Sequence, residues 1–378
     1  MDVSLAELEL NPHPVLAELR AREPVAWIPA LGAWLVTRRD LVVEAMRDAE
    51  TFTVDDERFS TGRVVGTSML TLDGSEHARH RSPFARDFRL DAVRERFAGR
   101  VEAEADRLID GFAPAGHAEL RRSLAGPLAV ASTAFALGLE RTDAGEVLGW
   151  YDAIVASVNA ITAGGEPTEE GKRAFEALRA RLGPELDVPE LDPDEAVSNA
   201  AVILFGGVET TEGMIANALY HLLAHPGELR RVLDDRSLLP NAIEESLRLE
   251  PAAAVVDRYA TRAIHFGGAA IGERDQVTLS LAGANRDPAV FADPDAYDVG
   301  RPNARLNVAF AHGPHVCVGM HLARLEARAA VGGVLDRLRH VRLEVDDPPR
   351  GLVFRKPPTL HAAWDGGNRP VYAEVVAT

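Results

Sequence analysis

The stretch FAHGPHVCVG, residues 310–319, contains Cys317, the only cysteine among the 378 residues of the chain. Two histidines, His312 and His315, precede the sulfur, and the run MHLARLEARAA follows the stretch directly. A single cysteine forms no internal disulfide and no zinc site that needs several cysteines. It also suits a reducing compartment. The role of Cys317 therefore decides how the rest of the chain is interpreted.

Three roles are open to Cys317 from its surroundings alone. It could be a small buried hydrophobe, the usual fate of a lone cysteine. It could be a nucleophile with His315 or His312 as its base, although neighbours in one loop rarely form a catalytic pair. It could also be the axial ligand of haem iron, because the porphyrin supplies four of the other ligands.

The loop itself suits the third role. Gly313 and Gly319 let the backbone pass close to a flat macrocycle. Phe310 can pack against the sulfur side of that ring. Cys317 lies just before a helix that is expected to begin near Val318, and the N–H groups and dipole of a helix start stabilise a thiolate.

The periodicity of the chain predicts a mainly α fold. Hydrophobic residues make up 46% of the chain, enough for a substantial core. Helices are expected at about 5–21, 40–50, 75–88, 91–111, 118–138, 143–161, 167–182, 193–224, 227–233, 239–249 and 318–338. Residues 53–67 are expected to form a loop. A small β-rich part is expected from residues 24–38, 255–281 and 341–364, within one domain that spans residues 1–378.

Charge and apolar runs limit the partners. The net charge of −17 disfavours nucleic acid, since a phosphate backbone is bound by basic patches. The longest apolar run, residues 124–139, contains a proline and two glycines and is too short to span a bilayer, so a buried helix is expected there. The N-terminus lacks the pattern of a secretory signal. We expect a cytoplasmic monomer with no membrane partner.

The pattern F-x-x-G-x-H-x-C-x-G resembles the haem loop of the cytochrome P450 family. EESLR at 244–248 resembles the E-x-x-R signature of that family, with Glu245 and Arg248 on one helix face as an ion pair. ANRDP at 284–288 is similar to a segment of bacterial members. The resemblance covers nearly the whole chain. It implies the cytochrome P450 fold, a triangular prism of helices around a buried haem b, with Cys317 as the thiolate ligand of the iron.

FGGVETT at 205–211 resembles the oxygen-activation motif of the family. Gly206 and Gly207 each cost about 1 kcal/mol inside the expected helix, relative to alanine, and would leave room for dioxygen. Thr210 can hydrogen-bond to a carbonyl one turn earlier and open the helix locally. Glu209 beside it is the expected proton source, because cleavage of dioxygen consumes two protons.

The resemblance also implies cations for the two haem propionates. His77 and Arg81 are four residues apart on one expected helix face, and they are joined by Arg258 and His315. Arginine and histidine make charge-assisted hydrogen bonds with carboxylates.

Several positions depart from the usual pattern of the family. Gly206 stands where an alanine is usual, Ala311 where glycine is common, and Asn307 where histidine is frequent. None of these changes removes a role that carries the chemistry. The segment 182–197 is shorter than in most bacterial members.

The substrate-facing positions follow from the resemblance as well. They are Phe205, Ala254, Val255, Val256 and Phe354. The three consecutive alanines at 252–254 would leave an open wall. This suggests a bulky, apolar substrate such as a polyketide, a terpenoid or a peptide-derived natural product, either free or attached to a carrier protein.

The implied reaction inserts one oxygen atom from O2 into the substrate, by hydroxylation or epoxidation. A thiolate ligand favours cleavage of the O–O bond. No G-x-G-x-x-G fingerprint is present, so electrons are expected from a separate ferredoxin or flavodoxin with an NAD(P)H-dependent reductase. The docking face of that partner is expected near Arg79, Arg86 and Arg324.

Two alternatives share most of these residues. A peroxygenase on the same fold would use hydrogen peroxide and would not need the Glu209–Thr210 pair. A non-catalytic haem protein would bind or sense a ligand without turnover. The intact pair disfavours both alternatives. A coupling or desaturating enzyme of the same family shares every residue named above.

Overall fold

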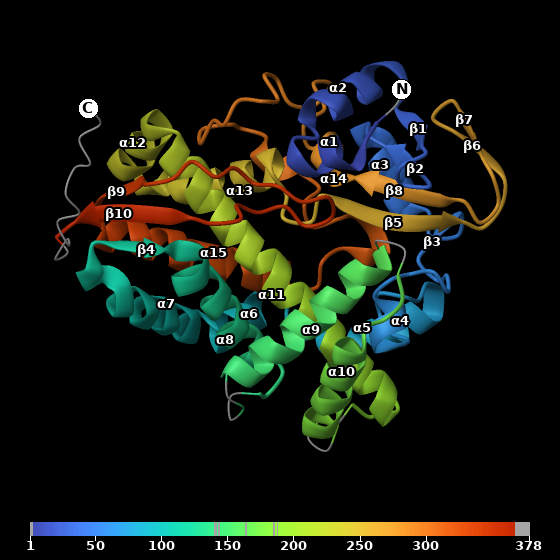
Figure 1. Ribbon diagram of the computed structural model, residues 1–378, viewed down its shortest axis with the longest axis horizontal. Coiled ribbons are helices and arrows are strands. Elements are labelled where there is room, and N and C mark those ends of the chain that lie inside the picture. The colour runs from blue at the N-terminus through green and yellow to red at the C-terminus, as the bar shows by residue number, and fades with distance from the viewer. Residues whose placement is uncertain are drawn as a thin grey trace, which may run out of the picture.

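The computed structural model describes residues 3–139, 142, 144–162, 165–183, 186 and 188–366. Helix α11 (Pro193–Ala224) crosses the centre of the molecule, and the other elements are arranged around it (Figure 1). The larger helices that surround it are α2 (His13–Arg22), α3 (Arg39–Arg47), α5 (Gly74–Ala85), α6 (Leu90–Arg96), α7 (Ala98–Phe112), α8 (Gly126–Ala136), α9 (Ala144–Thr162), α10 (Glu169–Leu182), α12 (Pro226–Asp234), α13 (Leu239–Leu249) and α15 (Met320–Arg337). This confirms the mainly α fold with a small β-rich part.

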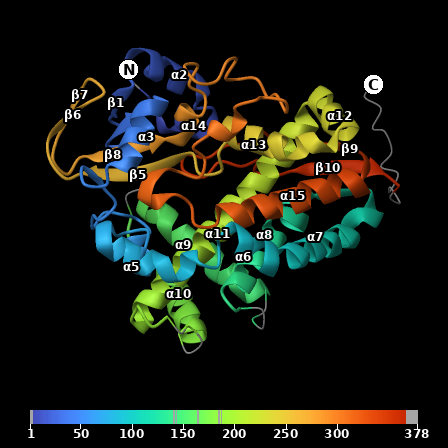
Figure 2. The same ribbon diagram turned by 180° about the vertical axis from the view of Figure 1, so that it is seen from behind.

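Helix α11 is the axis of the helical part. Asp192 caps its start by accepting a hydrogen bond from the backbone N–H of Glu195, and the Glu195 carboxylate accepts one from the N–H of Asp192. Such a capping box, with Pro193 in the first turn, fixes where the helix begins. Most of its residues are buried, because α8, α13 and α15 pack around it. Seen from behind, α15 runs between α13 and the helices α7 and α8 (Figure 2).

Two separate sheets lie at opposite ends of the molecule (Figure 1). The larger has the order β1 (Val25–Ile28), β2 (Ala33–Val36), β8 (Gln276–Ser280), β5 (Val255–Ala260) and β3 (Phe52–Thr53). Its β2 and β8 pair in parallel, and its other neighbours pair antiparallel. The smaller sheet joins β4 (His117–Glu119), β10 (His361–Asp365) and β9 (Arg339–Leu343). A hairpin of β6 (Ile264–Phe266) and β7 (Ala269–Ile271) stands apart.

Three expected helices are divided. The helix expected at 5–21 is two helices, α1 (Leu5–Leu10) and α2, because Pro12 lacks the N–H that a continuous helix needs. The helix expected at 91–111 breaks at Phe97 into α6 and α7. The segment expected as one helix at 118–138 starts as strand β4, which pairs with β10 some 240 residues later. A π-helical turn, Arg121–Ala125, then leads into α8.

The segment 53–67 is not a plain loop. It contains the end of β3 and the short helix α4 (Gly62–Val65). Another short helix, α14 (Leu281–Ala284), follows β8. The apolar run at 124–139 forms the buried helix α8, as expected. Within the described residues, no helix combines the length and the apolar character that crossing a membrane requires.

The Glu245–Arg248 pair forms the centre of a buried polar network. Both side chains are fully buried, and Arg248 Nε lies 2.7 Å from Glu245 Oε2. Arg301 reaches the other oxygen of Glu245 at 2.8 Å. Arg248 also donates to the backbone carbonyls of Asn285, Pro294 and Ala296. The network thus ties helix α13 to the irregular segment that leads to the cysteine loop.

Replacing Arg248 by alanine should strongly destabilise the fold. It leaves the buried Glu245 with one cation instead of two and frees several carbonyls. We expect the free energy of unfolding to fall by about 3–5 kcal/mol, measured by urea denaturation. The matched control is Arg231→Ala, which removes the ion pairs of a half-exposed arginine with Glu228 and Asp298 and should cost about 1 kcal/mol or less. Equal losses in the two variants would contradict this account.

Candidate active site

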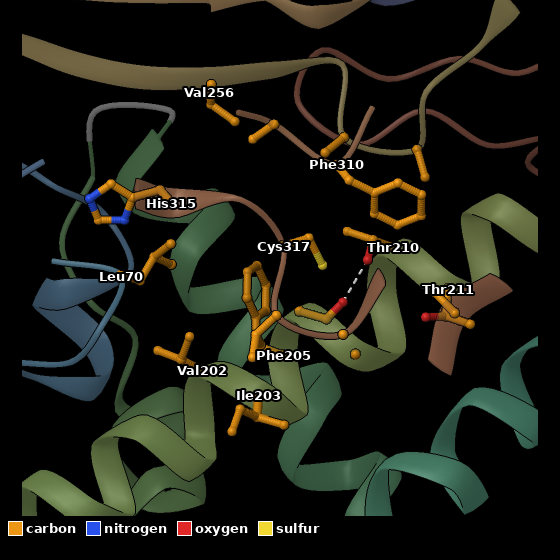
Figure 3. Close-up of a pocket in the computed structure, with 18 of the residues that line it drawn as sticks. Leu70, Val202, Ile203, Phe205, Thr210, Thr211, Val256, Phe310, His315 and Cys317 are labelled. Atoms are coloured by element: carbon orange, nitrogen blue, oxygen red, sulfur yellow. Dashed lines mark hydrogen bonds between the residues drawn. The ribbon is translucent and has the colours of Figure 1, made fainter. Parts of the chain in front are cut away.

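A cavity of about 350 Å³ lies between α11, the cysteine loop and strand β5. Figure 3 shows Cys317 on one side of it and Thr210 of α11 nearby. The apolar side chains that line it include Leu70, Val202, Ile203, Phe205, Val256, Phe310, Val353 and Phe354. Segments from most of the chain therefore meet in one largely apolar chamber.

The backbone of the cysteine loop is tightly constrained. The N–H of Cys317 donates to the carbonyl of Phe310 at 2.8 Å. Gly313 has a φ of +71°, and a Cβ there would lie 2.5 Å from the carbonyl oxygen of Met46. Only glycine fits that position. Ala311 also adopts a left-handed conformation, with a φ of 59°, which costs a residue other than glycine about 1–2 kcal/mol. This explains why glycine is common there in the family that the loop resembles.

The thiol of Cys317 lies in a mixed electrostatic environment. Burial raises its pKa, whereas the backbone N–H groups of Gly319 and Met320 and the charges of Arg81 and Arg324 act to lower it. Helix α15 begins at Met320, so these N–H groups belong to its start. Burial has the largest effect, so the pKa of the Cys317 thiol is raised on balance, and the donors and cations around it act in favour of the thiolate.

The glycines of α11 have different reasons to be glycine. A Cβ on Gly206 would meet nothing within 4 Å, whereas one on Gly207 would lie 2.7 Å from Oγ1 of Thr133 on α8. Gly206 therefore leaves open space in the cavity, and Gly207 allows two helices to approach closely. Thr210 donates its hydroxyl hydrogen to the carbonyl of Gly206 at 2.6 Å, as the sequence predicts (Figure 3).

Glu209 is buried but does not line the cavity. Its carboxylate pairs with Lys356 at 2.8 Å and accepts a hydrogen bond from the hydroxyl of Tyr151 on α9. Lys356 also pairs with Glu212 at 2.7 Å, and Arg121 holds Glu212 from the other side at 2.7 Å. The structure therefore places Glu209 in a charged network beside the cavity rather than facing Cys317.

Cationic and histidine side chains gather at one edge of the cavity. Arg81, Arg258 and His315 line it, and the ring of His77 lies 4.3 Å from that of His315. His77 is 5% exposed, and its Nε2 has no hydrogen-bond partner among the described residues. Burial and the neighbouring charges of His315 and Arg81 lower the pKa of His77 to about 4. Asp73 accepts from His315 at 2.7 Å. Asp73 binds only His315 of these side chains, so Arg81, Arg258 and Nε2 of His77 can bind further anions at this edge.

The structure brings together most of the site residues that the sequence indicates. The cavity is lined by Phe205, Gly206, Gly207, Thr210, Val255, Val256, Arg258, Phe310, His315, Cys317, Gly319, Phe354 and Arg81. Ala254 instead lines a neighbouring cavity of about 310 Å³, which shares Ser60, Val255, Asp257 and Val353 with the first. Gly313 shapes the loop from outside the cavity. Glu245 and Arg248 lie in the network described above.

These residues fit haem. One thiol is too few ligands for a metal site built from side chains alone, so the metal must come with an organic group that supplies the rest. The open space at Gly206 suits a small ligand above such a group. The orphaned nitrogen of His77, with Arg81, Arg258 and His315, suits the carboxylates at its edge. The site defines a haem-thiolate protein.

Known proteins agree with this class. A family model for cytochrome P450 matches residues 176–360. The cytochrome P450 monooxygenase PikC of Streptomyces venezuelae is 33% identical over 374 residues, which covers 93% of this chain and 89% of that protein. Nocardicin C N-oxygenase of Nocardia uniformis subsp. tsuyamanensis is 32% identical, over 94% of this chain and 96% of that protein.

Solved structures share the whole architecture. P450BioI, in complex with an acyl carrier protein ligated to hexadec-9Z-enoic acid, has a TM-score of 0.84 and 26% identity, over 95% of this chain and all of that chain. The hydroxylase HmtN has a TM-score of 0.81 and 27% identity, over 94% of this chain and 97% of that chain. The chain belongs to the cytochrome P450 family. It is a cytochrome P450 monooxygenase with haem b as its cofactor.

Three residues of the site have no role in the interpretation of the sequence. Lys356 and Tyr151 contact Glu209 from distant segments, and no local pattern reveals such contacts. Glu326 lines the cavity from α15. The sequence contains a signal for Glu326. This glutamate lies between Ala323 and Ala330 on the apolar side of α15, where a hydrophobic residue is expected.

Replacing Cys317 by serine should remove the thiolate-type absorption spectrum, even where haem stays bound, because the chain has no other cysteine. The check is the ferrous carbon monoxide spectrum. His312→Ala, in the same loop but outside the cavity, is the control and should keep the wild-type spectrum. An unchanged spectrum in the serine variant would end the ligand assignment.

Replacing Lys356 by methionine should destabilise the protein by about 3 kcal/mol, since it leaves Glu209 and Glu212 buried with one cation fewer. Burial acts to raise the pKa of Glu212, yet Lys356 and Arg121 hold it below its ordinary value of 4.5. A lowered carboxyl pKa stabilises the fold above that pH and loses its effect as pH falls. The difference between variant and wild type should therefore shrink below about pH 4.5.

The measurement is urea unfolding at several pH values. The control is Lys172→Met, the only other lysine, which is 54% exposed on α10. It should leave the free energy of unfolding nearly unchanged at every pH. A difference for Lys356→Met that persists unchanged in acid would show that the loss comes from packing rather than from charge.

Proposed function

We propose that this P450 monooxygenase inserts one oxygen atom into a bulky, mainly apolar natural product, by hydroxylation or epoxidation. The observation that carries the proposal is the apolar wall of the cavity that Cys317 also lines. Phe205 and Phe354 meet there edge to face, with ring centres 5.6 Å apart, and Val202 and Val256 extend the apolar surface. A surface of this kind binds carbon skeletons through burial of apolar area.

The names of relatives support this substrate class. HmtN is described as a post-tailoring hydroxylase of himastatin biosynthesis, and a 32% identical relative is named nocardicin C N-oxygenase. The second cavity beside Val255 and Val353 gives an extended substrate further room, and Ala254 would face that part. P450BioI is described with a fatty acid on an acyl carrier protein, so a substrate attached to a carrier belongs in the same proposal.

Each residue has a distinct task in this reaction. Haem, when bound, supplies the oxidising chemistry, and Cys317 would be its thiolate ligand. His77, Arg81, Arg258 and His315 would hold its carboxylates. The apolar wall excludes water and places a C–H bond or a double bond toward the thiolate side of the chamber.

The residues of α11 make room for oxygen and supply protons. Gly206 leaves the space in which a diatomic ligand fits, and the bond from Thr210 to the carbonyl of Gly206 keeps the hydroxyl group at that space. Glu209, buried beside the cavity, is the proton source of this helix, once its contacts to Lys356 and Tyr151 loosen.

Electrons would come from a separate ferredoxin or flavodoxin and its reductase. Arg86 is the most available of the three arginines suggested for docking, at 65% exposed. Arg79 is paired with Glu195, and Arg324 is paired with Glu244 and stacked on Phe310. We propose that the whole chain acts as one catalytic domain, because segments from Val54 to Phe354 line a single chamber. We also propose that it acts as a monomer.

A spin-state titration tests the proposed substrate class. The Soret band of the ferric holoenzyme is followed while macrolides, terpenoids, cyclic peptides and carrier-tethered acyl chains are added. We expect one scaffold class to shift the band to shorter wavelength and to be oxidised with O2, NAD(P)H and a ferredoxin system. Turnover of that compound with hydrogen peroxide alone would instead favour a peroxygenase. Conversion of small polar compounds only would overturn the proposal.

A further inference from the structure

The second cavity has a polar side that two paired strands form. Strands β5 and β8 are antiparallel, and alternate residues of each strand point to the same face of the sheet. Three cross-strand pairs line the second cavity: Val255 with Ser280, Asp257 with Thr278, and Tyr259 with Gln276. Val256 and Arg258, which alternate with them on β5, line only the first cavity. Each face of β5 therefore serves a different cavity.

This polar side departs from what the position of the sheet predicts. Helices α1 and α2 line the same cavity with Leu5, Leu8 and Leu16. The face of an antiparallel sheet that helices cover is ordinarily apolar. A row of polar side chains on such a face needs a physical reason, and a ligand with polar groups would provide one.

Asp257 lies in the wall that the two cavities share. Together with Ser60, Val255 and Val353, it lines both of them. The Asp257 carboxylate accepts a hydrogen bond from the hydroxyl of Thr278 at 2.6 Å. Of the four shared residues, Asp257 alone carries a charge. It can therefore contact a polar group of a molecule whose apolar part lies in the first cavity.

The charges that line the second cavity are balanced by ion pairs, with one exception. Three arginines line it, and each has a carboxylate of its own: Arg58 with Asp56 at 2.7 Å, Arg63 with Glu166 at 2.6 Å, and Arg355 with Glu250 at 2.6 Å. No ion pair joins Asp257 to a residue in the part of the chain that the structure describes. Burial raises the pKa of Asp257, and Thr278, Gln276 and Arg258 offset that rise only in part.

A cation on the substrate would complete this arrangement. A carboxylate in a site that excludes much of the water gains most from a partner that both donates a hydrogen bond and carries a positive charge. We propose that Asp257 binds a protonated amine of the substrate where the two cavities adjoin, while the carbon skeleton of the same molecule lies on the apolar wall of the first cavity. The inference rests on the proposed function and narrows its substrate class to natural products with a basic amine.

The position of Asp257 also indicates which atoms are oxidised. Its neighbour Arg258 belongs to the cationic edge of the first cavity, whereas the open space for oxygen lies at Gly206 on α11. An amine that is bound on β5 is kept away from that space. We therefore expect oxidation at a carbon remote from the nitrogen, and neither oxidation of the nitrogen nor loss of its alkyl groups.

Two amides of dodecanoic acid test the contact. One has a dimethylaminoethyl end, and the other has an isopentyl end, in which a CH group replaces the nitrogen. Their affinities for the ferric holoenzyme are measured by calorimetric titration. We expect wild type to bind the amine about 10–100-fold more tightly, as for a hydrogen bond between charged groups. In Asp257→Asn, this preference should fall below about fivefold, with little change in the affinity for the isopentyl amide.

Two further variants separate the contact from general effects. Asp257→Glu keeps the carboxylate and should retain part of the preference for the amine. Asp55→Asn makes the same chemical change at an exposed aspartate that lines neither cavity, and it should match wild type. Equal affinities of wild type for the two amides would overturn the inference without any variant. A shift of the Soret band to longer wavelength with the amine would also overturn it, because the nitrogen would then be bound to the iron.

Turnover with O2, NAD(P)H and a ferredoxin system separates this inference from the proposed function. Wild type should oxidise the amine probe at a narrow set of chain carbons, and Asp257→Asn should spread oxidation over more of them. Main products oxidised at the nitrogen or at its methyl groups would contradict the inference and leave the proposed function intact. A wild type that prefers the amine but oxidises neither amide nor any natural-product scaffold would contradict the proposed function and leave the contact with Asp257 established.

Discussion

The site depends on the hydrogen-bond donors and cations that the fold gathers around one sulfur atom, that of Cys317. Burial alone would leave Cys317 as a neutral thiol. The protein opposes this with two N–H groups at the start of α15 and with the charges of Arg81 and Arg324. Those donors are useful only if the loop is rigid, and Gly313 and the bond from Cys317 to Phe310 make it so. The loop in turn is anchored through the network of Glu245 and Arg248.

The opposite side of the chamber follows a different rule. Helix α11 packs closely against α8 and also leaves open space in the cavity. Two adjacent glycines allow this, each in a different way. Gly206 opens the cavity, whereas Gly207 brings α8 into contact.

The sequence predicts the parts of this site that are encoded locally. The threonine bond of α11 and the Glu245–Arg248 pair each follow from a few neighbouring residues, and the structure contains both contacts. Helix positions follow from periodicity with errors where a strand intervenes, as at β4, whose partner β10 lies far along the chain.

The contacts that the sequence could not reveal are those between distant segments. The orientation of Glu209 depends on Lys356 and Tyr151, and both are remote in the chain. Ala254 lines the second cavity. It lies just before strand β5, where its N–H donates to the carbonyl of Val353, and the local sequence does not reveal that distant contact. Side-chain direction at a helix crossing is likewise a property of the packed fold.

The scarcity of lysine gives the protein a practical property. Of its two lysines, Lys356 is 14% exposed and paired with two carboxylates, whereas Lys172 is 54% exposed on α10. An amine-reactive dye would therefore modify the side chain of Lys172 in preference to that of Lys356. Helix α10 packs on α9, whose Val158 lines the cavity, so a dye on Lys172 would sit one helix away from the wall of the chamber.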